Sequence, residues 1–151
     1  MGRFRRCVTV LNYTATMLQR DYIQRLIREF MAALQRLLEK KEAKVRQEEV
    51  RRMFAQYFGD YAFYHTASLD DIMRSIEKYP EEERLSRIEM LAELYNAEAD
   101  TMSEPMRTEV LERAFMLFDF VDRHGRVFSI DRVGKMDAIR KRLDGGVKPE
   151  E

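Results

Sequence analysis

The fold is decided by residues 80–125, which read PEEERLSRIEMLAELYNAEADTMSEPMRTEVLERAFMLFDFVDRHG. Apolar residues recur in this stretch at three- and four-residue spacing, which is the spacing of one face of an α-helix. The two faces consist of Leu85, Ile88, Leu91, Ala92, Tyr95 and Ala99, and of Val110, Leu111, Ala114, Phe115, Phe118 and Val121. Three glutamates after Pro80 suit a helix N-terminus, and Pro105 fits the first turn of the next helix. We therefore expect one helix that ends between Asp100 and Glu104 and a second that ends at Gly125.

The residues before this stretch predict two longer amphipathic helices. The first begins at Arg20 and has a broad apolar face, and the second ends at Gly59, because glycine readily adopts the left-handed conformation of a helix stop. The apolar face of the first helix consists of Ile23, Leu26, Ile27, Phe30, Met31, Leu34, Leu37 and Leu38. The apolar face of the second consists of Val50, Met53, Phe54, Tyr57 and Phe58. The segment Glu39–Arg46 contains neither Gly nor Pro, so the first helix either continues through it or breaks there.

Two further helices complete the predicted set. Ser68 caps one that Pro80 terminates, because the residue before a proline is pushed out of the helical conformation. Ser129 caps the other. Its apolar face consists of Val133, Met136, Ile139 and Leu143. The segment Cys7–Leu11 is rich in β-formers but has no partner strand, so the predicted class is all-α, with about six helices stacked as antiparallel hairpins or as an irregular bundle.

The composition agrees with one helical domain. Of 151 residues, 45% are hydrophobic and 36% are charged, with only six glycines and three prolines. This is too apolar for disorder and too poor in turn residues for a β fold. We expect a poorly ordered N-terminal extension at 1–16, a single helical domain at 17–144 and a frayed tail at 145–151. Met17 is an alternative to Met1 as the start, because regular helical periodicity begins directly after it.

Several function classes lack their sequence signature. Cys7 is the single cysteine, so no intramolecular disulfide can form, and a cytoplasmic location is the expectation. No run of eighteen apolar residues is present, so we expect no membrane partner. The sequence has no Gly-rich phosphate loop, nucleophile elbow or zinc-spaced Cys/His pairs, and neither His65 nor His124 follows a glutamate by three residues, the spacing of helical di-metal sites. We therefore predict no catalytic residue, no metal and no cofactor.

Charge is balanced overall but distributed unevenly. The chain has 27 basic and 27 acidic side chains. The net charge is +4 for residues 1–20, +3 for 21–58, −8 for 59–104 and +1 for 105–151. Arg51 and Arg52 lie in the basic part. We expect them to pair with the acidic segment of the same fold, to belong to an ordinary solvated face, or to face another chain. Because that acidic segment repels phosphate, nucleic acid is not an expected partner.

The two helices of the opening stretch resemble a tetratricopeptide repeat. The residues that carry the likeness are Ile88, Leu91, Ala92 and Tyr95 in the first helix, and Ala114, Phe118 and Val121 in the second. Tyr95 and Ala114 are nineteen residues apart where the repeat has nine, and Arg126 replaces the closing proline. These differences from the repeat pattern affect the turn between the two helices. We still expect the two helices to pack against each other.

The chain as a whole is also similar to a family of small, uncharacterised bacterial helical proteins that are related to tetratricopeptide folds. The likeness spans residues 20–143 and is carried by segments 21–27, 114–121 and 128–132. It implies a superhelix like that of tetratricopeptide repeats. It implies no activity and no site residues.

The most unusual segment is dense in aromatic residues. Six of them fall within Phe54–Tyr64, directly before His65. Such a density either fills the junction between the second and third predicted helices or forms a recognition surface. The candidate partner-binding residues are Tyr57, Tyr61, Tyr64, His65, Arg51 and Arg52.

From these features we expect a non-enzymatic module that binds a protein or peptide, because stacked amphipathic helices present grooves that accept other helices. Self-association is a further expectation, since the first helix has a broader apolar face than one neighbour covers. The alternative is a domain that binds or hydrolyses a small ligand in an aromatic pocket, with His65 and nearby tyrosines as its polar groups. That alternative requires His65 to face an enclosed hollow with an acidic or hydroxyl group in reach.

Overall fold

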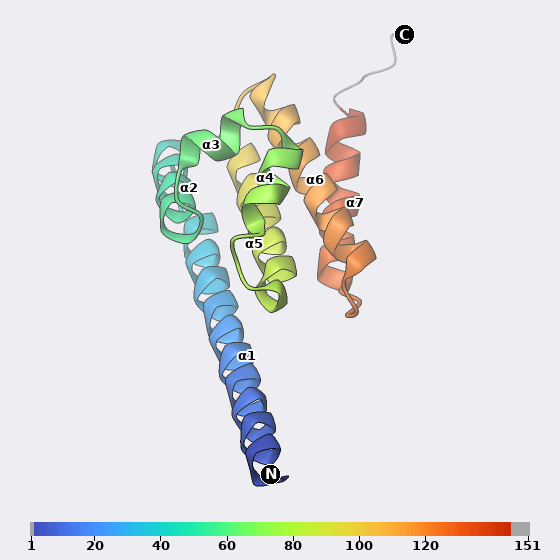
Figure 1. Ribbon diagram of the computed structural model, residues 1–151. Helices are drawn as coiled ribbons and strands as arrows, with labels where there is room; N and C mark the ends of the chain where they lie inside the picture. Colours follow the sequence, from blue (N-terminus) through green and yellow to red (C-terminus); the bar gives the residue numbers. More distant parts are fainter. Residues whose placement is uncertain (1, 146–151) are drawn as a thin grey trace.

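The structure, a computed structural model, is all-α and describes residues 2–145, with side chains from Leu18 onward. Over this range there are seven helices and no strand. They are α1 (Gly2–Leu38), α2 (Ala43–Tyr57), α3 (Tyr61–Thr66), α4 (Leu69–Ile76), α5 (Glu81–Ala99), α6 (Met106–His124) and α7 (Ile130–Gly145) (Figure 1). The predicted class is confirmed, and α3 adds a seventh helix to the six that the sequence predicts.

The first helix begins earlier than the predicted Arg20. Its backbone is helical from Gly2, because neither Gly nor Pro interrupts residues 3–20. Val and Thr residues in this segment lower its intrinsic helix propensity and so hid the helix from sequence inspection. Met1 lies outside the described residues. Residues 146–151, which form most of the predicted frayed tail, also lie outside them.

The break that the sequence left open occurs after Leu38, and α2 begins at Ala43. The Arg46 guanidinium turns back and donates hydrogen bonds to the carbonyl oxygens of Lys40 and, at 2.7 Å, of Leu38. The last carbonyls of a helix have no partner within it. Arg46 therefore satisfies one of them, that of Leu38, and fixes the turn between α1 and α2.

The turn after α2 depends on Gly59, as predicted. Its φ is +104°, a value that glycine adopts far more easily than other residues. The Phe54 carbonyl accepts hydrogen bonds from the amides of Phe58 and Gly59, both at 2.9 Å. The chain then forms α3, where the Asp60 carboxylate accepts a hydrogen bond from the Ala62 amide at 3.0 Å. With six residues, α3 is too short for a periodic face to reveal it.

Both predicted serine caps are confirmed. The Ser68 hydroxyl accepts a hydrogen bond from the Asp71 amide at 3.1 Å, and the Ser129 hydroxyl accepts one from the Arg132 amide at 3.1 Å. Each satisfies one of the free amides at a helix N-terminus.

Two details at the ends of α6 differ from the prediction. Pro105 precedes the helix instead of occupying its first turn. Gly125 ends the helix as predicted, but its φ of −79° is not left-handed. Glycine is favoured there because a Cβ atom would come within 2.8 Å of the Val121 carbonyl oxygen.

Helix α5 is the centre of the fold. It packs against α1, α2, α4 and α6, and α7 packs against α6 and forms ion pairs with α5 (Figure 1). Twelve of its 19 residues are buried, including the charged Glu83, Arg87, Glu93 and Glu98. The predicted single apolar face of this helix therefore understates its burial. Helix α1, in contrast, is covered only in part, because its N-terminal portion extends well beyond the remaining helices (Figure 1).

Candidate functional site

The predicted partner-binding residues divide between the core and the surface. Tyr57 and Tyr64 are only 8% and 2% exposed, so they pack inside the fold and cannot contact a partner. Tyr61 and His65 are partly buried, and Arg51 and Arg52 are exposed. We use the name aromatic cluster for Phe54, Tyr57, Phe58, Tyr61, Tyr64 and His65. This cluster fills the junction between α2, α3 and α5, which is the first of the two roles that the sequence suggested.

Within the aromatic cluster, His65 stacks on the Tyr61 ring with a centroid distance of 3.8 Å. The Phe54 ring lies edge-on to both rings. The Arg51 guanidinium lies 4.9 Å from the Tyr61 ring centroid, on the outer side of the cluster. Arg52 instead pairs with Glu49 at 2.6 Å on the surface of α2, so the structure does not bring it to this place.

Glu98 of α5 holds the polar atoms of the aromatic cluster together. The His65 Nε2 atom lies 2.5 Å from Glu98 Oε1, and the Tyr61 hydroxyl donates to Glu98 Oε2 at 2.7 Å. His65 Nδ1 lies 2.7 Å from the Tyr61 carbonyl oxygen. A carbonyl oxygen only accepts, so Nδ1 is the donor of this bond. Burial, reinforced by the Glu98 hydrogen bond and charge, raises the pKa of Tyr61.

Side chains of α5 and α6 form hydrogen bonds with the C-terminal end of the short helix α3. The Tyr95 hydroxyl donates to the Tyr64 carbonyl oxygen at 2.5 Å. The Arg113 guanidinium donates to the carbonyl oxygens of Tyr64 at 2.9 Å and Ala67 at 2.8 Å. These bonds satisfy carbonyls that a helix end leaves free. They explain why a helix of six residues is stable in this position.

The polar atoms that the alternative hypothesis assigns to the aromatic cluster have little access to a ligand. An acid and a hydroxyl are within reach of His65, as that hypothesis requires, but the Glu98 side chain is 0% exposed and that of His65 9% exposed. Both imidazole nitrogens are engaged inside the fold. No nitrogen is left to act as a general base on a bound molecule.

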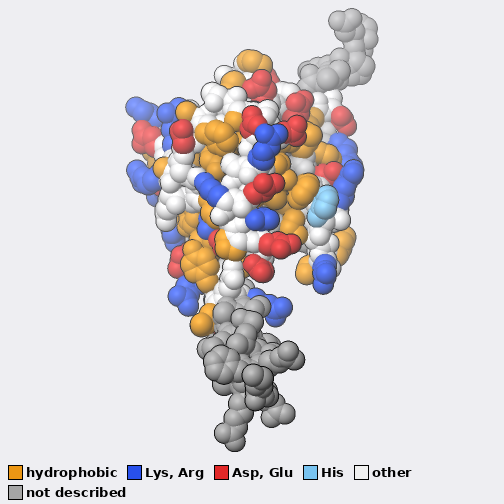
Figure 2. All heavy atoms as spheres, in the orientation of Figure 1, with side chains coloured by type: hydrophobic (Ala, Val, Ile, Leu, Met, Phe, Trp, Pro, Cys, Tyr) orange, Lys and Arg blue, Asp and Glu red, His pale blue; other side chains and the backbone are white. Residues whose placement is uncertain are grey.

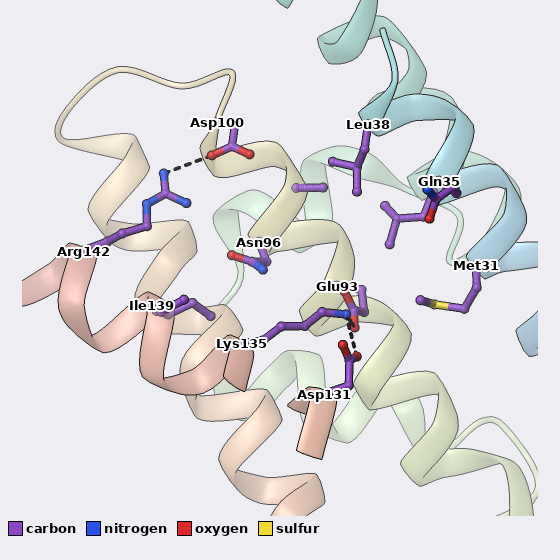
Figure 3. A pocket seen from close by; sticks show the side chains of 13 residues that line it. Met31, Gln35, Leu38, Glu93, Asn96, Asp100, Asp131, Lys135, Ile139 and Arg142 are labelled. Atoms are coloured by element: carbon purple, nitrogen blue, oxygen red, sulfur yellow. Dashed lines mark hydrogen bonds and ion pairs between the residues drawn. The ribbon is translucent and has the colours of Figure 1, made fainter. Parts of the chain in front are cut away.

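An open site lies on another side of α5, between α1 and α7, and we name it the α1–α7 groove. It encloses about 480 Å³. Its floor is formed by α5 and its walls by α1 and α7 (Figure 3). The lining side chains are Met31, Leu34, Gln35 and Leu38 of α1, Glu93, Asn96, Ala97 and Asp100 of α5, and Asp131, Lys135, Ala138, Ile139 and Arg142 of α7.

Two ion pairs join the floor of the α1–α7 groove to its α7 wall (Figure 3). The Lys135 ammonium lies 2.5 Å from Glu93 and 2.9 Å from Asp131, and Arg142 lies 3.1 Å from Asp100. Burial would lower the pKa of Lys135, but the hydrogen bonds and charges of Glu93 and Asp131 outweigh it and raise that pKa. Burial raises the pKa of Glu93, and Lys135 opposes this only in part. The groove thus carries paired charges and no unpaired buried group.

The α1 wall of the α1–α7 groove is apolar except for Gln35. Met31 and Leu38 are 38% and 42% exposed, although the sequence placed both on the buried face of the first helix. Leu34 and Ile139 lie deeper and are buried. The sequence analysis predicted none of the groove residues as a site. The sequence feature that points to the groove is the unusual width of the apolar face on α1. The groove can accept apolar side chains along α1 and polar ones along α7.

The charged side chains of the body do not gather into one patch on the face that Figure 2 draws. Figure 2 shows acidic and basic side chains spread over one face of the body, with hydrophobic side chains between them. Among the described residues, no three His, Cys, Asp or Glu side chains form a group that would hold a metal ion. Over the same residues, no helix has the length and hydropathy needed to cross a bilayer.

Comparison with models of protein families, with curated proteins and with solved structures finds no match to this chain. The resemblance to tetratricopeptide-related proteins therefore stays a prediction. The function has to be argued from the geometry of the two sites described above.

Proposed function

We propose that the protein is a non-enzymatic interaction module that binds one amphipathic helix of another protein in the α1–α7 groove. The observation that carries this proposal is the pairing of an exposed apolar wall, Met31 and Leu38, with a charged wall on α7. A binding helix offers the same two sides at once. The closed aromatic cluster, in contrast, has no room for a partner.

The dimensions of the α1–α7 groove suit a short helix. The lining residues on α7 run from Asp131 to Arg142, which is about 16 Å at 1.5 Å per residue. A helix of about three turns has this length. Its apolar residues at positions i, i+3/i+4 and i+7 would cover Met31 and Leu38.

The charges of the α1–α7 groove favour a basic residue on the partner helix. Three carboxylates, of Glu93, Asp100 and Asp131, face two cations, Lys135 and Arg142. Asp100 and Arg142 stay 43% and 38% exposed despite their contact, so a partner can reach both. We expect the partner to place a lysine or arginine beside Asp100, next to its apolar face.

The proposal is tested by capture from the native host with matched variants of the bait. Ala138→Glu puts a longer, charged side chain into the wall of the α1–α7 groove at an exposed position. Ala55→Glu makes the same change at an exposed position of α2, outside the groove. The expected partner is retained by the wild type and by Ala55→Glu, is lost by Ala138→Glu, and cross-links to α1 or α7 through a helical segment. If every captured protein is retained equally by both variants, the proposal is wrong.

A further inference from the structure

Helix α1 has a second uncovered apolar surface, away from the α1–α7 groove. Leu18 and Tyr22 are 64% and 52% exposed, although their neighbour Ile23 is buried against the body. Tyr22 and Leu38 are sixteen residues apart, which separates them by about 160° around the helix axis at 3.6 residues per turn. The surface at Leu18 and Tyr22 is therefore distinct from the surface of the proposed function.

The sequence continues this surface towards the N-terminus. The apolar residues Phe4, Val8, Leu11, Ala15, Leu18 and Tyr22 are spaced by 4, 3, 4, 3 and 4 residues. On a continuous helix this alternation selects a single seam, and it is the repeat by which two helices pair in a coiled coil. The backbone is one helix from Gly2 to Leu38, so the repeat falls on an unbroken helix. The places of residues 4–15 on the seam follow from their sequence spacing alone.

The part of α1 that carries the repeat stands outside the body of the fold (Figure 1). An isolated helix of about this length is marginally stable in water. A helix with an apolar seam gains stability by burying the seam against another helix. Since the body of the chain does not cover Leu18 or Tyr22, the covering helix comes from elsewhere.

We infer that the covering helix is α1 of a second copy, paired in the antiparallel direction. In that arrangement the seam residues meet as Phe4 with Tyr22, Val8 with Leu18 and Leu11 with Ala15, and each pair occurs twice. The overlap runs from residue 4 to residue 22, and the next residue, Ile23, is buried against its own body. The length of the repeat thus matches the length of helix that is free for pairing.

Charge favours the antiparallel direction over the parallel one. Residues 1–20 contain four arginines and no acidic residue, so a parallel pair would place like charges side by side. The antiparallel pair separates Arg3, Arg5 and Arg6 of the two copies. It brings Arg5 to the level of Asp21 and Arg6 to the level of Arg20 of the second copy. Asp21 is exposed on α1 and is the first carboxylate in the chain.

The pairing is tested by light scattering on the full-length chain over a range of concentrations. The expected mass approaches twice the 18.1 kDa of one chain and falls on dilution. Leu18→Glu puts a charge into the seam at a position that the body does not cover, so it should weaken self-association about tenfold or more. Tyr22→Glu should act in the same way, which guards against a folding defect specific to one variant.

Gln24→Glu is the matched control. It adds the same charge to α1 at an exposed residue, but about 120° around the axis from Leu18, and should leave self-association unchanged. Circular dichroism should show equal thermal stability for the body in all variants. A mass of one chain at the highest concentration, or a dimer that Leu18→Glu and Tyr22→Glu leave intact, would overturn the inference.

The direction of pairing is tested with Cys7, the one cysteine of the chain. Antiparallel pairing places Cys7 of one copy at the level of Gln19 of the other, one residue from Leu18, whereas two Cys7 residues are about 18 Å apart along the axis. Mild oxidation should therefore link the L18C variant into a covalent dimer and leave the wild type unlinked. A covalent wild-type dimer, or an L18C variant that stays unlinked, would contradict the antiparallel direction.

Discussion

The aromatic cluster and the α1–α7 groove lie on different sides of α5, and their polar groups differ in exposure to solvent. In the aromatic cluster, Glu98 is completely buried, and its oxygens are taken by Tyr61 and His65. In the groove, Asp100 is 43% exposed although it contacts Arg142. The cluster holds the fold together, whereas the groove keeps polar and apolar atoms available to another molecule.

This contrast shows that aromatic density alone does not mark a binding surface. Rings are large, so they contribute strongly wherever apolar area is buried, and a core benefits from them as much as an interface does. The groove is instead built from ordinary side chains of α1, α5 and α7, which are far apart in the sequence. Substitutions on the two sides of α5 test this difference.

The largest expected effect is that of Tyr64→Ala. Tyr64 is 2% exposed and packs against Phe54, Phe58 and Phe63. Removing the ring leaves a cavity, which should lower the free energy of unfolding by about 3–5 kcal/mol. Urea denaturation followed by circular dichroism measures this change. Unaltered stability together with loss of a binding partner would instead place Tyr64 on a recognition surface.

Next in size is Glu98→Ala, which removes the acceptor of two buried hydrogen bonds. His65 and Tyr61 lose their partner in an environment with little water, so we expect a loss of about 3 kcal/mol in the free energy of unfolding. Tyr61→Phe removes only one of the two bonds and should cost about 1 kcal/mol. The double variant should lose less than the sum of the single ones, because Tyr61 and Glu98 contact each other. Strict additivity would show that the pair is not coupled.

Alkaline pH should unfold the protein through the aromatic cluster and its neighbours. Burial is the main cause that raises the pKa of Tyr57, Tyr61 and Tyr95 above the ordinary 10.0. A raised folded-state pKa gives stability that is fully present below the ordinary value and is lost as the pH rises through the folded value. Lys135 in the groove adds a loss of the same sign above its ordinary 10.5.

The measurement compares tyrosinate absorbance with helicity during a base titration. We expect the absorbance of the buried tyrosines to rise together with the loss of helicity above about pH 10. Ionisation of Tyr57, Tyr61 and Tyr95 in a chain that keeps its full helicity would show that these hydroxyls are accessible in the folded state.

The smallest expected effect on stability is that of Ala138→Glu on the groove side. The residue is exposed on α7, and surface substitutions usually change the free energy of unfolding by no more than about 0.5 kcal/mol. Thermal denaturation beside Ala55→Glu measures the difference. A loss comparable to that of Glu98→Ala would mean that the groove is part of the core and not an open surface.

Much of the fold was predictable because the helices end at residues with local causes. Ser68, Ser129 and Gly59 act within a few residues of themselves, so the sequence alone reveals them. Helix α3 was missed because its stability comes from Tyr95 and Arg113, which are distant in the sequence. The start of α1 was missed because Val and Thr weaken the helical signal before Met17.

The candidate site was harder to predict than the fold. His65 was recognised as unusual, but its partner Glu98 stands in a segment that reads as an ordinary amphipathic helix. The burial of Glu98 depends on α3 folding over it, which no local pattern encodes. Met31 and Leu38 were assigned to the core because periodicity gives the width of an apolar face and not the number of neighbours that cover it.

The central position of α5 has a consequence for how this protein responds to a ligand. In the proposed function, a helix bound in the groove would stabilise only conformations in which α5 is in place, and the same α5 carries Glu98. Thermodynamic linkage then transmits the binding free energy to α3, which no ligand atom touches. Amide hydrogens of Tyr61–Thr66 that exchange through openings of α5 should become slower to exchange in proportion to the occupancy of the groove.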